Sequence, residues 1–214
     1  VCIAPETHFL HRFSSVAQRS KYTSQIGNLL DDRNIDKFLD LVYSPPKISA
    51  FWQWLKRNID REVFKQRVLA ARDREVDIFT LLMQMFAEGT VEKPVSDLIL
   101  GEKTPAHLGY VPTLLEWYPQ AKIIHTFRDP RAITASRIKK VRKTHIGLKS
   151  KYPTLPGWFL DPLDVPVEIA RMSHYWFNAS QLHLQYSQAY PQNYLMIRYE
   201  DLITEPEEQL KQVC

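Results

Sequence analysis

The sequence is poor in glycine and cysteine and has no long apolar run. Its 214 residues include 6 Gly and 2 Cys, and the cysteines, Cys2 and Cys214, stand at opposite ends of the chain. Such a pair provides neither a disulfide framework nor the ligand spacing of a zinc site. No apolar stretch approaches the roughly 18 residues of a membrane-spanning helix. We therefore expect no membrane segment within residues 1–214.

Common phosphate- and metal-binding motifs are missing as well. The sequence contains no GxxxxGK[ST] phosphate loop, no GxGxxG turn, no HExxH pair and no Cys/His cluster. These absences exclude a complete Walker-type nucleotide site from these residues, and they predict no metal site. What the chain has is 44% hydrophobic and 12% aromatic residues, enough to bury a substantial core, and a formal net charge of +4. The positive charge favours an anionic partner.

Short apolar strands alternate with helical stretches along the chain. Apolar runs predict four strands, at 1–4, 96–100, 122–127 and 194–198. Helical spacing of apolar residues predicts helices over 34–86 (in three stretches, the last closed by Gly89), 106–118, 130–143 and 167–189, and from Pro206 onward. The segment 153–166, rich in Pro and aromatic residues, is expected to be a loop. Because strands and helices alternate, we expect one α/β domain built on a parallel sheet.

An unusual polar residue follows each predicted strand. These residues are Glu6, Lys103, Arg128 and Tyr199, in strand order. In parallel sheets, ligands bind beyond the carboxyl ends of the strands. The sequence therefore predicts that the four side chains form one site at the same edge of the sheet.

The stretch from Arg128 to Lys143 is the most informative part of this pattern. Arg128 stands at a strand tip, a helix begins at Pro130, and Ser136 lies on the second turn of that helix. An arginine, helix-start amides and a hydroxyl make a suitable phosphate site. The alternative is that these residues belong to a solvated basic helix face.

Glu6 and Lys103 suit acid–base and charge-neutralising roles. A carboxylate just after a buried strand can act as a general base, with His8 and His11 as competing bases. A lysine at the same sheet edge can stabilise a leaving phosphate or sulfate oxygen. The alternatives are a surface lysine in a turn and histidines that only cap or pack.

Four motifs, in this order, carry a family resemblance. PETHFL (5–10), GEKTPAHL (101–108), YPQAKIIHTFRDPRAITAS (118–136) and YLMIRYEDLITEPEEQL (194–210) resemble the sulfotransferases that use 3′-phosphoadenosine 5′-phosphosulfate (PAPS). The likeness is greatest to their bacterial and protein-tyrosine branch. It implies a P-loop NTPase-like α/β fold, a parallel sheet flanked by helices, with a helical insertion on the acceptor side at about 14–95.

The resemblance also implies roles for individual residues. Arg128 and Ser136 correspond to the residues that hold the nucleotide 3′-phosphate, and Tyr199 to one that approaches the nucleotide. Glu6 corresponds to the base and Lys103 to the lysine near the transferring sulfate. Lys140 falls where that branch has a further basic contact to the nucleotide. PAPS is then the co-substrate, and no metal is required.

The family's 5′-phosphosulfate loop precedes the strand that leads to the PET motif, and it is not among these residues. Because the chain begins at Val1 and stops inside a helix, we expect a single domain truncated at both ends, without its first strand and phosphate loop, and inactive as it stands. The acceptor stays open: a peptide tyrosine, a carbohydrate or a small molecule. Aromatic residues of two segments are candidates for the acceptor cleft, with packing in the core as the alternative: Phe51, Trp52, Trp54, Trp158 and Phe159.

Two other functions compete with this interpretation. A P-loop kinase would use the same strand-tip geometry but expects a Walker lysine and an acidic magnesium ligand. A binding module could hold a polyanion on the basic stretch 137–151, although this stretch lacks the interleaved aromatics that stack on bases, so no nucleic acid is expected. The scarcity of cysteine favours a cytoplasmic location, and oligomeric state is left open.

Overall fold

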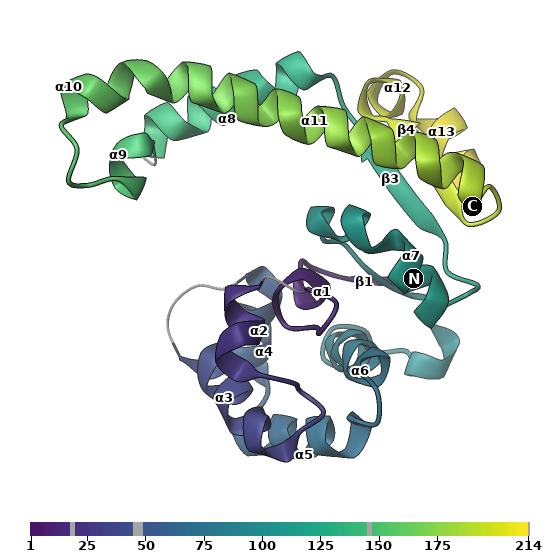
Figure 1. Cartoon of the computed structure of the whole chain (residues 1–214). Coiled ribbons are helices and arrows are strands. Elements are labelled where there is room, and N and C mark those ends of the chain that lie inside the picture. Colours follow the sequence, from purple (N-terminus) through teal and green to yellow (C-terminus); the bar gives the residue numbers. More distant parts are fainter. Residues whose placement is uncertain (18–19, 45–48, 145–146, 214) are drawn as a thin grey trace. The chain divides into compact units, whose positions relative to one another are not determined.

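The computed structural model describes residues 1–17, 20–44, 49–144 and 147–213 (Figure 1). The chain divides into two compact units, Val1–Thr113 (unit 1) and Leu114–Cys214 (unit 2), and each is described by itself. The predicted positions Pro45, Pro46 and Cys214 lie outside the described residues. Among those residues, no helix combines the length and the apolar character needed to cross a membrane.

Unit 1 consists of a two-stranded sheet and a set of helices. Its elements are β1 (Cys2–Ala4), α1 (Phe9–Arg12), α2 (Lys21–Ile26), α3 (Asp32–Tyr43), α4 (Ala50–Asn58), α5 (Arg61–Ala71), α6 (Glu75–Glu88), η1 (Val95–Asp97), β2 (Leu100–Glu102) and η2 (Pro105–Tyr110), and α7 (Val111–Trp117) crosses into unit 2. β1 and β2 pair in parallel, with Ala4 opposite Glu102. The parallel pairing predicted from the sequence is confirmed for these strands.

The helices of unit 1 enclose an aromatic core. Phe13, Phe38 and Trp52 are fully buried, and their ring centroids lie 5.3–5.8 Å apart. The indole Nε1 of Trp52 donates to the backbone oxygen of Thr7 at 2.7 Å, which ties the loop after β1 to this core. Phe51 is fully buried too, so Phe51 and Trp52 are core residues.

The helical stretch expected to end at Gly89 is two helices rather than one. α5 ends at Ala71 and α6 begins at Glu75. The Glu75 carboxylate is buried, where it accepts hydrogen bonds from Ser14 Oγ at 2.5 Å and from the Ser15 backbone N–H at 2.7 Å. A carboxylate at a helix start that also binds distant donors makes the break favourable. Gly89 is the C-cap of α6, as the sequence indicates.

The strand predicted at 96–100 is wrong by several residues. Val95–Asp97 form the 3₁₀ turn η1, and the strand begins at Leu100. Pro94 precedes the turn, and the Leu98 N–H donates to the Val95 carbonyl, which closes the chain locally instead of extending it. Lys103 nevertheless directly follows the strand, as expected.

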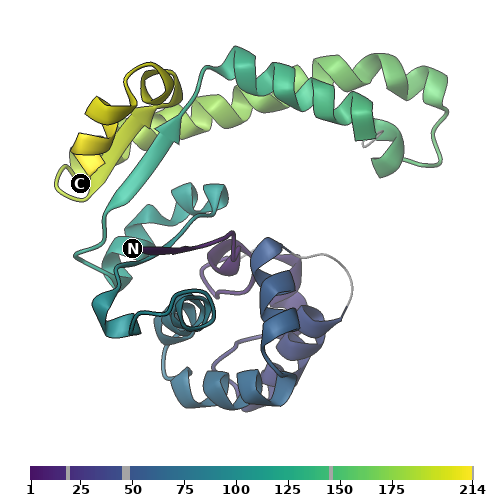
Figure 2. The same ribbon diagram turned by 180° about the vertical axis from the view of Figure 1, so that it is seen from behind.

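Unit 2 also combines a two-stranded parallel sheet with helices. After α7, its elements are β3 (Ile123–Phe127), α8 (Pro130–Thr144), α9 (Leu148–Lys151), α10 (Gly157–Leu160), η3 (Asp161–Leu163), α11 (Asp164–Ala189), β4 (Tyr194–Arg198), α12 (Tyr199–Thr204) and α13 (Pro206–Val213). Within this unit, α8 and α11 run side by side, and α10 lies at the end of α11 remote from β3 and β4 (Figures 1 and 2).

The register of β3 and β4 pairs Ile123 with Tyr194 and Phe127 with Arg198. The predicted loop at 153–166 is partly helical, since it contains α10 and η3, and α11 begins at Asp164. Pro166 is accommodated because it lies in the first turn of α11, where its missing N–H has no intrahelical partner to lose. The structure thus has two small parallel sheets with helices, and the single continuous sheet stays a prediction.

Candidate functional site

In unit 1, the residues that follow β1 and β2 form an ion pair. Lys103 Nζ lies 2.6 Å from Glu6 Oε1. His8 Nε2 lies 3.3 Å from the other oxygen of the same carboxylate. Because the strands are parallel and in register, the side chains that leave their carboxyl ends meet at one edge. The sequence prediction that Glu6 and Lys103 lie together agrees with this geometry.

Glu102 holds the backbone beneath this pair. Its Oε1 accepts from the Thr7 N–H and the Thr7 hydroxyl, both at 2.8 Å, and from the Thr104 hydroxyl. Its Oε2 lies 2.9 Å from Nδ1 of His107. Burial raises the pKa of Glu102, but the hydrogen bonds from His107, Thr104 and Thr7 outweigh it and leave this pKa below its ordinary value. Glu102 therefore fixes the residue next to Glu6 and the residue next to Lys103 at once.

Three histidine rings lie beside this network. The ring centroids of His8 and His11 are 4.9 Å apart, and those of His11 and His107 are 6.1 Å apart. Burial lowers the pKa of His8, and it lowers the pKa of His11 to about 4, so both rings are neutral near pH 7. A pKa near 4 makes His11 a weaker base than an ordinary histidine.

In unit 2, the residues that follow β3 and β4 also meet. The Arg128 guanidinium lies over the Tyr199 ring, 4.4 Å from its centroid. Trp176 Nε1 donates to the Arg128 carbonyl at 3.1 Å, which fixes the backbone at the strand tip. The neighbouring Arg131 is held by Asp129, whereas no carboxylate pairs with the Arg128 side chain in the described part of the chain. Arg128 therefore presents an exposed, oriented cation.

The start of α8 differs from the expectation in one respect. The Asp129 N–H donates to Glu200 at 3.0 Å, and the Arg131 N–H donates to Asp129 at 2.7 Å, so carboxylates already occupy two helix-start amides. Ser136 and Lys140 are exposed and lie one turn apart on the same face of α8. Ser136 is roughly 9 Å along the helix from its start. An anion held by Arg128 and Ser136 would thus rely on side chains more than on amides.

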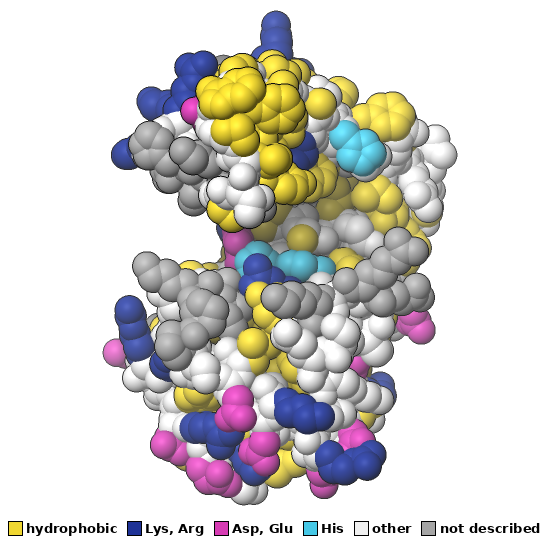
Figure 3. Space-filling view, turned by 60° about the vertical axis from the view of Figure 1, so that its left-hand side comes forward, with side chains coloured by type: hydrophobic (Ala, Val, Ile, Leu, Met, Phe, Trp, Pro, Cys, Tyr) yellow, Lys and Arg dark blue, Asp and Glu magenta, His cyan; other side chains and the backbone are white. Residues whose placement is uncertain are grey.

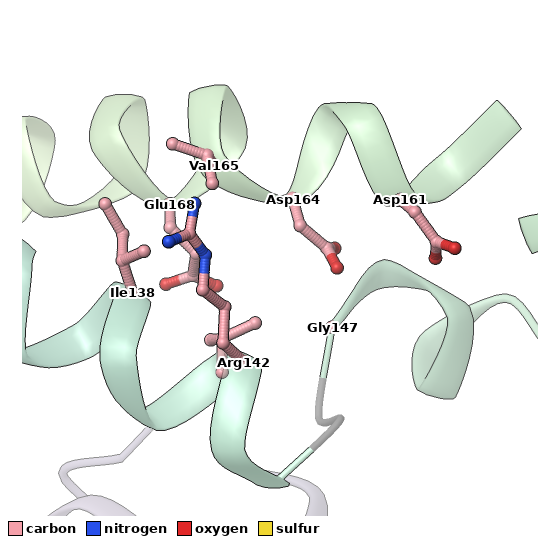
Figure 4. Close-up of a pocket in the computed structure, with 8 residues that line it drawn as sticks. Ile138, Arg142, Gly147, Asp161, Asp164, Val165 and Glu168 are labelled. Atoms are coloured by element: carbon pink, nitrogen blue, oxygen red, sulfur yellow. The ribbon is translucent and has the colours of Figure 1, made fainter. Parts of the chain in front are cut away.

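A cavity of about 620 Å³ lies elsewhere in unit 2, between α8, α9 and α11 (Figure 4). Its lining residues are Ile138, Val141, Arg142, Gly147, Asp161, Asp164, Val165 and Glu168. Asp164 accepts the Leu148 N–H at 2.6 Å, and Glu168 pairs with Arg137 and Arg171. The six residues predicted to form the site do not line this cavity, and two of its three carboxylates, those of Asp164 and Glu168, are engaged by the protein's own donors.

Sequence reasoning missed the buried role of Glu102 and its bond to His107. Leu100 and Glu102 share one side of β2, and this alternation was the available signal for the burial of Glu102. Within the described residues, no group of three or more His, Cys, Asp or Glu side chains is arranged to hold a metal ion.

Comparison with known proteins gives a consistent result. A family model described as "Sulfotransferase family" matches residues 32–214. Two curated relatives are the omega-hydroxy-beta-dihydromenaquinone-9 sulfotransferases Stf3 of Mycobacterium bovis and Mycobacterium tuberculosis, each 31% identical over 143 residues. The aligned region covers 65% of this chain and 33% of each relative, so the chain spans about a third of their length. No solved structure matches.

Proposed function

Because the chain belongs to the sulfotransferase family, we propose that the whole protein transfers a sulfuryl group from PAPS to an acceptor hydroxyl or amine. The observation that carries the proposal is that each of the two strand pairs is followed by a contact between charged or aromatic side chains. One ends in the Glu6–Lys103 ion pair, and the other in Arg128 stacked on Tyr199. A proton acceptor, a cation for a leaving oxygen and a cation for a phosphate are the groups that this reaction needs.

In the proposed reaction, the acceptor oxygen or nitrogen forms a bond to sulfur while the bond from sulfur to the bridging phosphate oxygen breaks. Glu6 takes the proton of the acceptor, and adenosine 3′,5′-bisphosphate leaves. Lys103 neutralises the negative charge that develops on the bridging oxygen. The ion pair between Glu6 and Lys103 supports this division of roles, since it holds the two groups 2.6 Å apart before substrate binds.

The nucleotide is proposed to bind through its 3′-phosphate. Arg128 would pair with this phosphate, and Ser136 and Lys140, on one exposed face of α8, would add a hydroxyl and a second cation. Tyr199 positions the guanidinium by its 4.4 Å contact. Arginine suits this role because its planar donors match phosphate oxygens in pairs.

The printed name of the two relatives specifies an omega-hydroxy-beta-dihydromenaquinone, which agrees with a hydroxyl as the attacking group. A kinase that uses ATP with magnesium is the competing function, and the following experiment separates the two.

Arg128→Ala tests the nucleotide site. Adenosine 3′,5′-bisphosphate at about 100 times its dissociation constant should stabilise the wild-type protein by about 2.7 kcal/mol, measured as a thermal shift. We expect Arg128→Ala to lose this shift. The matched control is Arg131→Ala, an exposed arginine held by Asp129 in the same turn, which should keep it. Stabilisation by ATP with magnesium and not by the 3′,5′-bisphosphate would instead support a kinase.

Glu6→Gln tests the base in the active full-length protein. We expect kcat to fall by about 100-fold with nearly unchanged nucleotide affinity, because Gln keeps the size of the side chain but cannot take the proton. Glu92→Gln, an exposed glutamate of the same unit, is the control. Near-normal turnover in Glu6→Gln would move the role to His8.

A further inference from the structure

A group of large apolar side chains points into solvent at one end of unit 2. We call it the aromatic tip, and its members are Tyr152, Leu155, Trp158, Phe159 and Leu163. Trp158 is 79% exposed, Tyr152 53% and Phe159 51%, and the two leucines are exposed as well. Five such residues within twelve positions exceed the scattered apolar exposure that is normal for a protein surface.

The local structure holds these side chains outward. Leu160 is buried and anchors the short helix α10, whose neighbours in the unit are α9 and η3. The N–H groups of Phe159 and Leu160 donate to the Pro156 carbonyl, at 3.1 and 3.3 Å, and the Leu155 N–H donates to the Tyr152 carbonyl. Trp158 and Phe159 pack edge to face, 6.1 Å apart. The chain thus uses one apolar residue for packing and leaves the aromatic ones exposed.

The tip belongs to a basic part of the chain. Residues 137–168 contain seven Lys and Arg against three Asp and Glu, a formal net charge of +4 that equals that of the whole chain. The remaining residues are therefore balanced in charge. Of the carboxylates in this segment, Glu168 pairs with two arginines and Asp164 accepts a backbone N–H, whereas Lys139 and Lys143 are exposed.

The position of the tip suits contact with an extended surface. α10 lies at the end of α11 remote from β3 and β4 (Figures 1 and 2). Figure 3, in which the end of unit 2 that carries α10 comes forward, shows hydrophobic side chains gathered there, with Lys and Arg side chains along the neighbouring edge. The aromatic side chains of the tip do not line the cavity between α8 and α11.

We propose that the aromatic tip docks onto the surface of an anionic lipid bilayer. Tryptophan and tyrosine favour the level of the lipid headgroups, where an apolar ring and a polar N–H or O–H are both accommodated, and phenylalanine and leucine insert at the boundary between headgroups and acyl chains. Basic residues nearby are attracted by anionic lipids. A second copy of the chain is a poorer occupant, because a symmetric contact would bring two segments of net charge +4 together.

Vesicle co-sedimentation of the chain tests this proposal. We expect binding to phosphatidylcholine vesicles that contain phosphatidylglycerol, much weaker binding to phosphatidylcholine alone, and loss of binding as salt is raised. The double substitution Trp158→Ala and Phe159→Ala should weaken binding by about tenfold or more, since it removes the inserted area. Its control is Ile99→Ala with Val63→Ala, which removes side chains 72% and 53% exposed in unit 1.

Substitution of two exposed lysines gives a second, independent test. Lys139→Gln with Lys143→Gln should weaken binding to anionic vesicles by about tenfold and reduce its salt dependence. Lys56→Gln with Arg57→Gln, an exposed basic pair on α4, should leave binding unchanged. Each variant is first shown by thermal melting to keep the wild-type stability, which solvent-exposed substitutions should preserve.

Three outcomes would overturn the proposal. They are no binding to anionic vesicles, binding that persists in the Trp158→Ala and Phe159→Ala variant, and self-association that this variant abolishes in the absence of lipid. The test is separate from that of the proposed function. Vesicle binding needs no nucleotide, and the thermal shift by adenosine 3′,5′-bisphosphate should persist in the Trp158→Ala and Phe159→Ala variant.

Discussion

Replacement of Glu102 should destabilise unit 1, and Glu102→Ala should cost more stability than Glu102→Gln. In Glu102→Ala, the Thr7 N–H and the His107 ring lose a buried acceptor, whereas the two threonine hydroxyls can rotate toward other partners. A buried polar group left unpaired costs about 1–3 kcal/mol, so the loss for two such groups is about 4 kcal/mol. Glu102→Gln keeps the oxygen that serves the threonines but turns an amide N–H₂ toward His107. We expect it to cost about 2 kcal/mol.

Urea unfolding followed by tryptophan fluorescence measures the free energy of unfolding. Trp52 reports on this region, because its indole bonds the Thr7 carbonyl at 2.7 Å and is buried. Hydrogen exchange of the peptide that contains Thr7 gives a local measurement, and its amide should lose protection in Glu102→Ala. The exposed Glu92, replaced in the same two ways, should change the stability by less than about 0.5 kcal/mol.

The reasoning would be refuted by a loss below about 1 kcal/mol in Glu102→Ala, or by equal losses in the Ala and Gln variants. The first result would mean that water replaces the carboxylate without penalty. The second would mean that the charge on Oε2 and the bond to His107 matter more than the three bonds to Oε1.

Two further predictions concern unit 2. Burial lowers the pKa of His125 to about 4, so between pH 6.5 and 4 the unfolded chain binds a proton that the folded chain does not, and stability falls with pH. With allowance for solvent screening, the free energy of unfolding should fall by about 1 kcal/mol between pH 7 and pH 5. His125→Asn should remove this pH-dependent loss, measured by urea unfolding at both pH values. An unchanged pH profile in the variant would contradict the prediction. Gly147→Ala places a methyl group against the Asp164 carboxylate and should displace it from the Leu148 N–H, at a cost of about 1–3 kcal/mol in thermal melting. Gly109→Ala, where nothing lies within 4 Å of the added carbon, is the neutral control, and equal melting of the two variants would show that the cavity wall yields freely.

The sequence alone predicted the candidate site residues where their position follows from one physical rule. Parallel strands carry their ligand-binding residues at the carboxyl ends, and this rule selects Glu6, Lys103, Arg128 and Tyr199 from the sequence. The structure pairs the first two in unit 1 and the last two in unit 2. The family assignment agrees with the resemblance carried by the four motifs.

The features that could not be predicted depend on partners far apart in the chain. Glu102 binds Thr7 across 95 positions, and Glu75 binds Ser14 across 61, and no local pattern indicates either bond. The second of these bonds accompanies the helix break that apolar spacing did not indicate. The aromatic residues of 152–163 were expected to line a cleft or to join the core, because composition cannot tell an exposed tryptophan from a buried one.

The strand register of unit 2 has a consequence for how this family can vary. Phe127 stands opposite Arg198, so the next residue of each strand, Arg128 and Tyr199, leaves the sheet at the same level. The intervening chain, including the 26 residues of α11, lies outside the sheet. Insertions or deletions in that crossover leave the stacked pair intact, whereas a single residue added within β4 would turn Tyr199 to the opposite face. Among relatives, the number of residues between the motif that contains Arg128 and the motif that contains Tyr199 can therefore vary, while the distance of each motif from its own strand stays fixed.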